Sequence, residues 1–369
     1  MKKLNIVQII HSVKDVGGAE TFIIDLTLEL IKQGHNVTLI SFYKERGFYN
    51  KVINDNNIPT IYLNKHKGPD LKTALILRRL LKKIKPDIVH SHTNTNLTYF
   101  LGRITNIKGI SFVETIHTSY VSKAHNWLLK RIIKKSYVSR KVFPVAISSE
   151  VNNYANQYFG KNLEAEIILN GINLPDNISS ENFKSRPFDF ITVSRLVEVK
   201  NHLSLIKATK ILADKGYNFS ISIVGDGPMK NIIYDEVKNN NLEKYVNLLG
   251  LRTDIFDLLQ QHKVFVLPSF WEGNPIALLE AMACNLSVIA TNVGGTVDII
   301  DHNSNGLLID PNNYHSLADA MEKTLTDPDF TETSAQKNLQ LSKKYSIETT
   351  AKDYVSLYKK ILSKKFKRE

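Results

Sequence analysis

The sequence alternates short apolar runs with amphipathic stretches of helical length, and this alternation limits the folds that the chain can adopt. In the first half the apolar runs occupy residues 6–10, 37–42, 88–90, 110–113 and 145–147, and stretches such as residues 19–33 and 71–85 separate them. Short runs that are bounded by Gly, Pro or Asp and lack polar alternation are typical of parallel strands with helices on both faces. The first half is therefore predicted to form a doubly wound α/β domain.

The same pattern starts again in the second half of the chain. Residues 173–187 are rich in Asn, Ser, Asp and Pro and are predicted to be a linker. New apolar runs follow at residues 190–193, 220–224, 246–249, 264–267 and 287–290. A chain of 369 residues is long enough for two domains. We therefore expect two α/β domains, residues 1–172 and 188–351, that bind ligands beyond the carboxyl ends of their strands.

Positive charge is concentrated in the first half. Residues 1–172 carry 25 Lys and Arg against 12 Asp and Glu, whereas residues 173–369 carry 23 against 24. Such an asymmetry is typical of proteins with an anionic partner, which here would be membrane lipid, nucleic acid or a phosphorylated substrate. The alternative is a basic surface that serves only solubility.

The cysteine count and the hydropathy of the chain exclude several classes of protein. The single cysteine, Cys284, rules out an intramolecular disulfide and therefore a secreted, disulfide-stapled protein. The first apolar run ends at His11 without a small-residue cleavage site, which favours a buried strand over a signal peptide. No run approaches the roughly 18 apolar residues that cross a bilayer. We expect a cytoplasmic protein that at most lies on a membrane surface.

The strongest motif lies in residues 268–282 and contains two glutamates, Glu272 and Glu280. Asn274 and Pro275 between them suit the cap and the first position of a helix, which places Glu272 in a loop and Glu280 inside the helix. An ionised carboxylate can accept paired hydrogen bonds from a ribose diol. Free backbone N–H groups at the start of the helix could hold phosphate or sugar hydroxyls. Chance would explain two glutamates at this spacing, but not the Gly-Asn-Pro sequence between them.

Two further segments carry residues suited to a diphosphate. Arg195 and Lys200 follow the first strand of the second domain, where both could reach one diphosphate and stabilise the charge on a leaving phosphate. Gly17 and Gly18 follow the first strand of the first domain and open a helix, where the backbone can approach an anion closely. The alternatives are ordinary surface charges and a plain tight turn.

Together these motifs resemble those of the retaining glycosyltransferases of family 4, whose GT-B fold has two Rossmann-like domains that face a central cleft. The resemblance covers nearly the whole chain. Glu272 and Glu280 match the E-x7-E motif of the family, and Arg195 with Lys200 matches its diphosphate-binding pair. Further matches are Gly17-Gly18-Ala19-Glu20, Glu114-Thr115-Ile116-His117, Asn170-Gly171-Ile172 before the hinge, Leu249-Gly250-Leu251-Arg252-Thr253-Asp254 beside the base, and Val293-Gly294-Gly295. Asp298 departs from the Glu that many relatives carry.

The resemblance implies a role for each predicted site residue. Glu280 would bind the ribose, Arg195 and Lys200 the diphosphate, and Glu272 the donor sugar. The other donor-binding residues would be Gly17, Gly18, Leu251, Arg252, Gly273, Asn274, Pro275 and Ile276. His117 would line the cleft near the sugar and the acceptor, or else be a buried structural histidine. The catalytic group would thus be His117, Glu272, Arg195 and Lys200, and no residue is an obvious covalent nucleophile.

The resemblance also assigns a part to each domain. The first domain would bind the acceptor, with residues 352–369 packed back on it as a helix, and the second would bind the nucleotide sugar. Transfer would retain the anomeric configuration through attack on the same face of the sugar. A UDP-sugar is favoured over a GDP-sugar as the donor.

No metal or other cofactor is expected beyond the nucleotide-sugar co-substrate. The Asp-x-Asp segment at Asp327 and Asp329 follows a predicted helix and is interpreted as a turn. His90 and His92 are expected to face opposite sides of their strand, which would not suit a shared metal. On this view His92 borders the cleft and His90 is structural.

Three basic segments suggest where the acceptor lies. Residues 123–141, 71–85 and 359–369 contain seven, six and six Lys or Arg, and the first two contain no acid. They predict contact with an anionic membrane surface, at the inner face of the cell membrane, and a lipid-linked or other glycan acceptor for a hexose or N-acetylhexosamine. The Lys-, Asn- and Ile-rich composition suggests a bacterium, in which such enzymes build surface polysaccharides.

Several other functions remain open at this point. A nucleotide-sugar 2-epimerase of similar fold would need no acceptor. A dehydrogenase is disfavoured because Gly225-Asp226-Gly227-Pro228 lacks a third glycine. A basic, non-enzymatic nucleic-acid-binding module lacks a zinc finger or an aromatic binding motif, so no nucleic-acid partner is expected.

Overall fold

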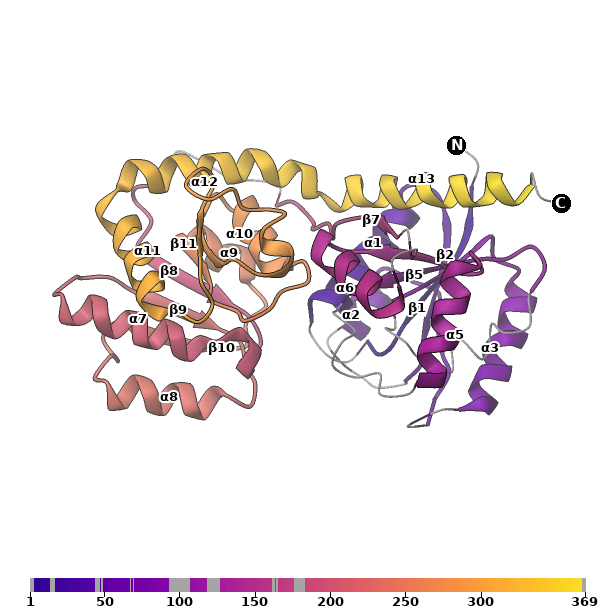
Figure 1. Ribbon diagram of the computed structural model, residues 1–369, viewed down its shortest axis with the longest axis horizontal. Coiled ribbons are helices and arrows are strands. Elements are labelled where there is room, and N and C mark those ends of the chain that lie inside the picture. Colours follow the sequence, from indigo (N-terminus) through magenta and orange to yellow (C-terminus); the bar gives the residue numbers. More distant parts are fainter. Residues whose placement is uncertain are drawn as a thin grey trace. The chain divides into compact units, whose positions relative to one another are not determined.

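A computed structural model of the chain describes residues 3–13, 17–43, 47, 49–66, 68, 70–92, 107–117, 127–160, 163, 165–175 and 183–366. The chain forms two compact units (Figure 1). The first unit comprises Met1–Gly171 together with Ile347–Glu369, and the second comprises Ile172–Ser346. Each unit is built on one parallel sheet, so the predicted pair of α/β domains is confirmed.

The first unit has a seven-stranded parallel sheet of order β3-β2-β1-β4-β5-β6-β7. Its strands are β1 (Asn5–Ile10), β2 (Asn36–Ser41), β3 (Thr60–Tyr62), β4 (Ile88–Ser91), β5 (Ser111–Ile116), β6 (Phe143–Ala146) and β7 (Glu166–Ile167). Its described helices include α1 (Gly18–Lys32), α2 (Tyr49–Asp55), α3 (Leu71–Ile84), α5 (Trp127–Val138), α6 (Ser149–Phe159) and α13 (Ile347–Phe366). The central strands β4 and β5 are buried along their whole length, as is typical of parallel strands with helices on both faces.

Local sequence signals explain where these helices begin and end. Asp70 caps α3, and its carboxylate accepts a hydrogen bond from the N–H of Thr73 at 2.9 Å. Lys85 ends α3 in the left-handed conformation, directly before Pro86, which cannot continue a helix. The last helix, α13, packs against α1 in the first unit (Figure 1). Its Tyr354 and Tyr358 are buried.

The second unit has a six-stranded parallel sheet of order β10-β9-β8-β11-β12-β13. Its strands are β8 (Phe188–Val193), β9 (Ile221–Val224), β10 (Val246–Gly250), β11 (His262–Leu267), β12 (Ser287–Thr291) and β13 (Leu307–Ile309). Its helices are η2 (Glu198–Lys200), α7 (His202–Asp214), α8 (Lys230–Asn239), α9 (Ile255–Gln260), α10 (Ile276–Ala283), η3 (Gly294–Thr296), α11 (Tyr314–Thr326), α12 (Pro328–Ser342) and η4 (Lys343–Tyr345). Apolar residues of α7, α8 and α11 form one core with alternate residues of the strands, such as Val264 and Val266.

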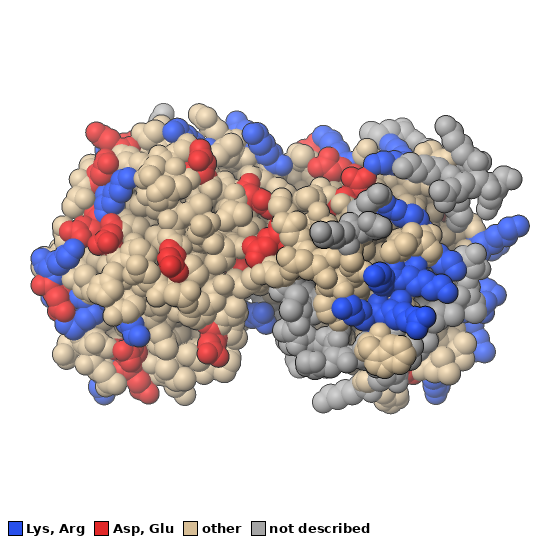
Figure 2. All heavy atoms as spheres, in the orientation of Figure 1, with Lys and Arg blue, Asp and Glu red and all other residues tan. Residues whose placement is uncertain are grey.

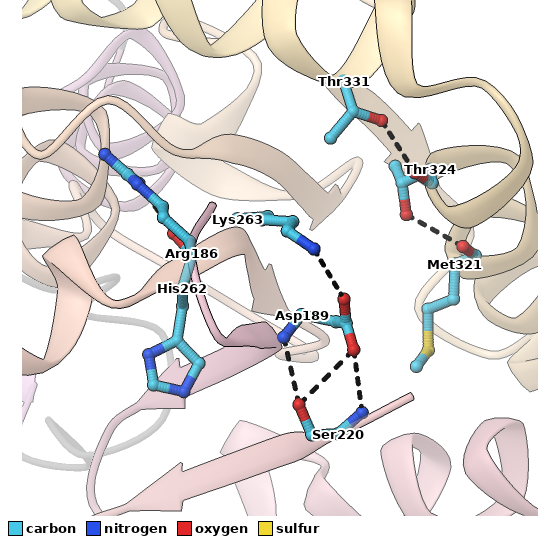
Figure 3. Close-up of polar contacts among 8 residues, drawn as sticks. All are labelled: Arg186, Asp189, Ser220, His262, Lys263, Met321, Thr324 and Thr331. Atoms are coloured by element: carbon cyan, nitrogen blue, oxygen red, sulfur yellow. Dashed lines mark hydrogen bonds and ion pairs between the residues drawn. The ribbon is translucent and has the colours of Figure 1, made fainter. Parts of the chain in front are cut away.

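Of the segment predicted as a linker, residues 173–187, the structure describes residues 173–175 and 183–187. Arg186 is buried, and its guanidinium donates hydrogen bonds to the carbonyl oxygens of His262, Cys284 and Asn285 at 2.6, 3.0 and 3.1 Å. This fork ties the entry of the second unit to β11 and to the end of α10. Near the same edge of the sheet, Asp189 accepts hydrogen bonds from Ser220 and Lys263 (Figure 3). The second unit therefore begins before residue 188.

Candidate functional site

In the second unit, the strand order brings together the motif of Arg195 and Lys200 and that of Glu272, which lies 72 residues after Lys200. β8 and β11 are neighbours in the sheet, so the loops that follow them meet at its carboxyl edge. The N–H of Phe270 donates to the carbonyl oxygen of Val199 at 2.8 Å, and the side-chain amide of Asn201 donates to that of Pro268 at 3.0 Å. The loop with Arg195 and Lys200 is thus tied to the loop with Glu272.

Glu272 is buried and is held by two donors. Its Oε1 accepts hydrogen bonds from Lys200 Nζ at 2.7 Å and from Ser269 Oγ at 2.6 Å. A buried carboxylate is costly unless it is paired and hydrogen-bonded, and both conditions hold here. The structure therefore brings two predicted site residues, Glu272 and Lys200, into direct contact. Ser269 was missed, although it lies within the motif three residues before Glu272.

The glycine turn that begins η3 supports the Glu272 loop. The N–H of Gly295 donates to the carbonyl oxygen of Glu272 at 3.1 Å. A Cβ atom on Gly294 would lie 1.6 Å from that same oxygen, and one on Gly295 would lie 2.1 Å from the carbonyl oxygen of Gly273. Gly294 also has a φ of +55°, which favours glycine. Close backbone approach therefore explains the Val293-Gly294-Gly295 sequence.

A second pair of glycines supports the loop after β8. A Cβ atom on Gly225 would lie 1.9 Å from the carbonyl oxygen of Ser194, and one on Gly227 would lie 2.4 Å from that of Leu196. The N–H of Leu196 donates to the carbonyl oxygen of Asp226 at 2.9 Å. These glycines let the backbone pack closely against the residues on either side of Arg195. Close packing explains both glycines, so a dinucleotide-binding motif is not needed to explain them.

Arg195 and Glu280 differ in their surroundings. Arg195 is exposed, and within the described part of the chain its guanidinium makes no hydrogen bond or ion pair. Glu280 is partly exposed inside α10, as predicted. The helix begins one residue later than predicted, because Pro275 has an extended ψ of 107° and is itself the N-cap. Gly273, Asn274 and Ile276 are buried around this helix start.

The predicted base loop is exposed at the end of β10. Leu251 is 64% exposed, and Arg252 Nε donates to Asp254 Oδ1 at 2.8 Å. A second bond joins the Arg252 guanidinium to the other oxygen of Asp254. Arg252 is therefore held by its own loop, whereas the Leu251 side chain presents an apolar surface to solvent.

In the first unit, Gly17 and Gly18 begin α1 at the carboxyl edge of the sheet. Gly17 is the N-cap and Gly18 the first helical residue. The N–H of Thr21 donates to the carbonyl oxygen of Gly17 at 2.9 Å. Asp15 and Val16, which directly precede them in the sequence, lie outside the described residues.

His117 directly follows β5 and is 6% exposed. Its Nε2 lies 3.1 Å from Nδ1 of His92. Burial lowers the pKa of His117 to about 4, so the ring is neutral at physiological pH. The structure thus places the predicted histidine at a strand end, beside a second histidine.

The expectation that His90 and His92 face opposite sides of their strand is wrong. Side chains two residues apart on a strand share a face, and these two rings lie with their centroids 4.0 Å apart and their planes tilted by 38°. Among the residues that the structure describes, no group of three or more His, Cys, Asp or Glu could hold a metal ion. Asp327 is the N-cap of α12, and its carboxylate accepts a hydrogen bond from the N–H of Phe330 at 3.0 Å.

Comparison with known proteins identifies the family to which the chain belongs. Two family models match the chain in succession, Glycosyltransferase Family 4 over residues 16–175 and Glycosyl transferases group 1 over residues 175–341. The Escherichia coli UDP-Gal:alpha-D-GlcNAc-diphosphoundecaprenol alpha-1,3-galactosyltransferase is 30% identical over 292 residues, which cover 73% of this chain and 74% of that protein. The chain belongs to glycosyltransferase family 4. It is therefore a glycosyltransferase with the GT-B fold.

Two further relatives of this glycosyltransferase extend the comparison over almost its whole length. One is the Campylobacter jejuni GalNAc-alpha-(1->4)-GalNAc-alpha-(1->3)-diNAcBac-PP-undecaprenol alpha-1,4-N-acetyl-D-galactosaminyltransferase, which is 26% identical over 358 residues, 92% of this chain and 94% of that protein. The other is the crystal structure of Anabaena Alr3699/HepE in complex with UDP. It has a TM-score of 0.81 at 20% identity and covers 97% of this chain and all of that one. The chain thus shares its fold with a protein that is only 20% identical to it in sequence. Membership of the family decides for a glycosyltransferase against the epimerase, dehydrogenase and nucleic-acid-binding alternatives.

Proposed function

We propose that this enzyme transfers a hexose or an N-acetylhexosamine from a UDP-sugar to a lipid-linked glycan acceptor, with retention of the anomeric configuration, in the synthesis of a cell-surface polysaccharide. The observation that carries the proposal is the contact of Lys200 with Glu272, in the loop that also carries the exposed guanidinium of Arg195. It combines a sugar-binding carboxylate with two cations at the carboxyl edge of one sheet.

The donor would be held by charges on fixed elements. Arg195 offers a planar fork of N–H donors to the diphosphate, and Lys200 offers a point charge. Both would stabilise the negative charge that develops on the leaving nucleotide, which supports transfer without a metal ion. Glu280 would bind the ribose. UDP is supported by the names of the E. coli relative and the Anabaena complex, which specify UDP-Gal and UDP.

Retention would proceed by attack on the same face of the sugar, with the leaving phosphate helping to deprotonate the acceptor. The structure supports a binding role for Glu272 because its Oε1 already accepts two hydrogen bonds. A covalent nucleophile would need a lone pair directed at the anomeric carbon. His117 would lie against the sugar or the acceptor as a neutral hydrogen-bonding group.

The acceptor would lie on the side of the first unit. This unit carries 32 Lys and Arg against 15 Asp and Glu, whereas the second carries 16 against 21. Figure 2 shows Lys and Arg gathered on one face of the first unit and mixed with Asp and Glu on the second. The E. coli and C. jejuni relatives are named for undecaprenol-linked acceptors. A peripheral position at the inner face of the membrane would bring the enzyme to such an acceptor.

No helix in the described part of the chain is long and apolar enough to cross a bilayer. Contact with the membrane would instead use surface helices. In α5, Ile133 and Tyr137 are buried against the unit, while Arg131, Lys134 and Lys135 are exposed. Trp127 at the start of this helix is 69% exposed and could enter the lipid headgroup region.

A donor screen tests the proposed function. The purified enzyme is incubated with UDP-, GDP- and ADP-sugars, with and without EDTA, and released nucleotide and thermal stabilisation are measured. We expect one UDP-sugar to stabilise the enzyme and to be hydrolysed slowly, and EDTA to have no effect. Both responses should disappear in Arg195→Ala and Glu280→Ala. A well-folded enzyme that responds to no donor would contradict the proposal, and a response only to a GDP-sugar would correct the nucleotide.

The acceptor is tested with matched compounds. A short-chain lipid diphosphate carrying one N-acetylhexosamine is compared with the same sugar without the lipid diphosphate. We expect transfer to the first compound to be much faster, and NMR of the product to show the anomeric configuration of the donor. Equal rates with both compounds, or an inverted product, would overturn the corresponding part of the proposal.

A further inference from the structure

Gln8 and three histidines lie together at the carboxyl edge of the sheet in the first unit. They come from three neighbouring strands, because β1 lies beside β4 and β4 beside β5. Gln8 is in β1, His90 in β4, and His92 and His117 directly follow β4 and β5. All four side chains are buried, and none is exposed by more than 6%. Among them, His117 alone was predicted to take part in the reaction.

The hydrogen bonds of this cluster indicate which ring nitrogen carries the proton in His92 and in His117. Oε1 of Gln8 can only accept, so the N–H that meets it at 2.7 Å is Nε2–H of His92. A neutral imidazole carries one proton, which leaves Nδ1 of His92 as an acceptor. The nitrogen 3.1 Å from it, Nε2 of His117, must therefore carry the proton of the His117 ring. The chain Gln8–His92–His117 thus selects one tautomer at each ring.

Both rings are neutral for the same physical reason. Burial lowers the pKa of His92 well below its usual range, and the neighbouring His90 and His117 lower it further. Two hydroxyl groups contact the third histidine, His90. Tyr358 Oη lies 2.6 Å from its Nδ1, and Thr115 Oγ1 lies 2.7 Å from its Nε2. Because a hydroxyl can donate or accept, these contacts fit either tautomer of His90. Of these contacts, the hydrogen bond to Nδ1 of His92 is the one that bears on the tautomer of His117, and the contact with Gln8 selects the tautomer of His92.

We propose that Gln8 and His92 are positioning residues that hold His117 in the Nε2-protonated form, with the lone pair of the ring on Nδ1. This inference rests on the proposed role of His117 in sugar transfer. In that form His117 can accept, but not donate, a hydrogen bond through Nδ1. The hydroxyl that it contacts in the reaction would then be a donor, as an attacking or a bound sugar hydroxyl is.

The first test needs no activity. The enzyme is labelled with ¹⁵N- and ¹³C-histidine, and long-range spectra that correlate ring nitrogens with ring carbons are recorded at neutral pH. His92→Asn and His117→Asn identify the two rings. We expect both rings to be neutral and protonated on Nε2. A His117 ring that is protonated on Nδ1, or on both nitrogens, overturns the proposal.

The second test separates positioning from stability. His92→Leu removes the acceptor of His117 Nε2–H and is expected to lower kcat about ten-fold, the effect of one misplaced hydrogen-bonding group, with little change in the donor KM. His92→Asn places an amide oxygen near the former Nδ1 and should restore kcat to within about three-fold of the wild type. The control is His35→Leu, because the Nδ1 atom of this buried histidine accepts the N–H of Leu4 at 3.1 Å. It should lower Tm without changing kcat.

The outcomes keep the two proposals apart. If His117→Ala abolishes transfer while His92→Leu and Gln8→Leu retain the wild-type kcat, the positioning role is wrong and the proposed function stands. If the wild type transfers no sugar from any donor, the proposed function fails, and the histidine spectra still decide which tautomer the cluster holds. If His92→Leu does not fold, the wild-type spectra remain the deciding measurement.

Discussion

Lys200 contacts a carboxylate and is also expected to bind a phosphate, and this double contact can be tested at the residue scale. Lys200→Met would leave Glu272 buried with Ser269 as the remaining donor that the structure gives it. We expect kcat/KM for the donor to fall about 10²–10³-fold, as for other groups that stabilise transition-state charge. Initial rates with varied donor measure the effect.

The matched control for this variant lies in the same unit. Lys210 pairs with Asp214 on the surface of α7, away from the motif loops. Because exposed ion pairs contribute little, Lys210→Met should leave kcat/KM within about two-fold of the wild type. A similar loss in both variants would show that Lys200 has no special part in donor binding.

Gly294 gives a second prediction at this scale. A methyl group on Gly294 would collide with the carbonyl oxygen of Glu272, whereas one on Gly216 would meet no heavy atom within 4 Å. Both glycines have positive φ, of +55° and +83°. Gly216→Ala should therefore cost about 1–2 kcal/mol of unfolding free energy from conformation alone. Gly294→Ala should cost more than this and also weaken donor binding. Urea unfolding and nucleotide titration check both effects, and equal costs would contradict the packing argument.

At the scale of elements, α13 completes the core of the first unit. It supplies the hydroxyl groups of Tyr354 and Tyr358, which contact Thr115 at 2.8 Å and His90 at 2.6 Å. A chain that ends after Ser346 would lose these contacts and expose the surface of α1 that α13 covers. We expect the first unit to lose protection against amide hydrogen exchange while the second unit keeps it. Removing only residues 367–369 is the control, and a truncated chain with unchanged protection would refute this.

The strands show how much of the fold the sequence determines. The ten predicted strands are all present, and most of the residues in their apolar runs are buried. In the described part of the chain three strands were missed: β3 and β13 have three residues each, and β7 has two exposed ones. Segments this short carry no periodicity, and the edge of an existing sheet determines their structure. The burial of Arg186 could not be predicted from the sequence either. Its hydrogen-bond partners are backbone carbonyl oxygens, which every residue carries.

The site was partly predictable for a related reason. A contiguous motif such as that of Glu272 and Glu280 can be recognised from the spacing of its residues. The structure confirms that Glu272 lies in a loop and Glu280 in the helix that follows. The tie of Ser269 to Glu272 depends on rotamers, and the cluster around His92 depends on strand order. Neither has a signature in a single sequence. The expectation for His90 and His92 is wrong for a simpler reason, because the two-residue alternation of side chains along a strand places both on one face.

At the scale of the whole molecule, buried histidines make stability depend on pH. The pKa is lowered to about 4 for His117 in the first unit and to about 4 for His202 in the second, from a usual value of 6.5, because burial disfavours the charged ring. The unfolded chain then binds more protons, so stability falls as the pH drops from 6.5 towards 4, by about 3 kcal/mol for each such ring. Urea unfolding across this range should show the loss, and His117→Asn should reduce its slope. The exposed His315→Asn is the control, and a flat profile in the wild type would contradict the argument.

The charge asymmetry of the two units predicts how the molecule meets a membrane. We expect the enzyme to float with anionic vesicles at low salt and to be released as salt shortens the Debye length to about 8 Å. Lys134→Glu with Lys135→Glu on α5 should abolish flotation. The matched pair Lys230→Glu with Lys238→Glu on α8 of the second unit should not. A wild type that stays with the soluble fraction at low salt would refute the proposed membrane contact.

The return of α13 to the first unit also has a consequence for biosynthesis. The sheet of the first unit leaves the ribosome before the second unit, but Tyr354 and Tyr358, which belong to its core, are translated only after the whole second unit. The second unit lies in one continuous segment, Ile172–Ser346, and is complete before α13 emerges. The nascent chain can therefore fold its second unit while the first still exposes the apolar face of α1. The order of domain completion is then the reverse of the order of synthesis.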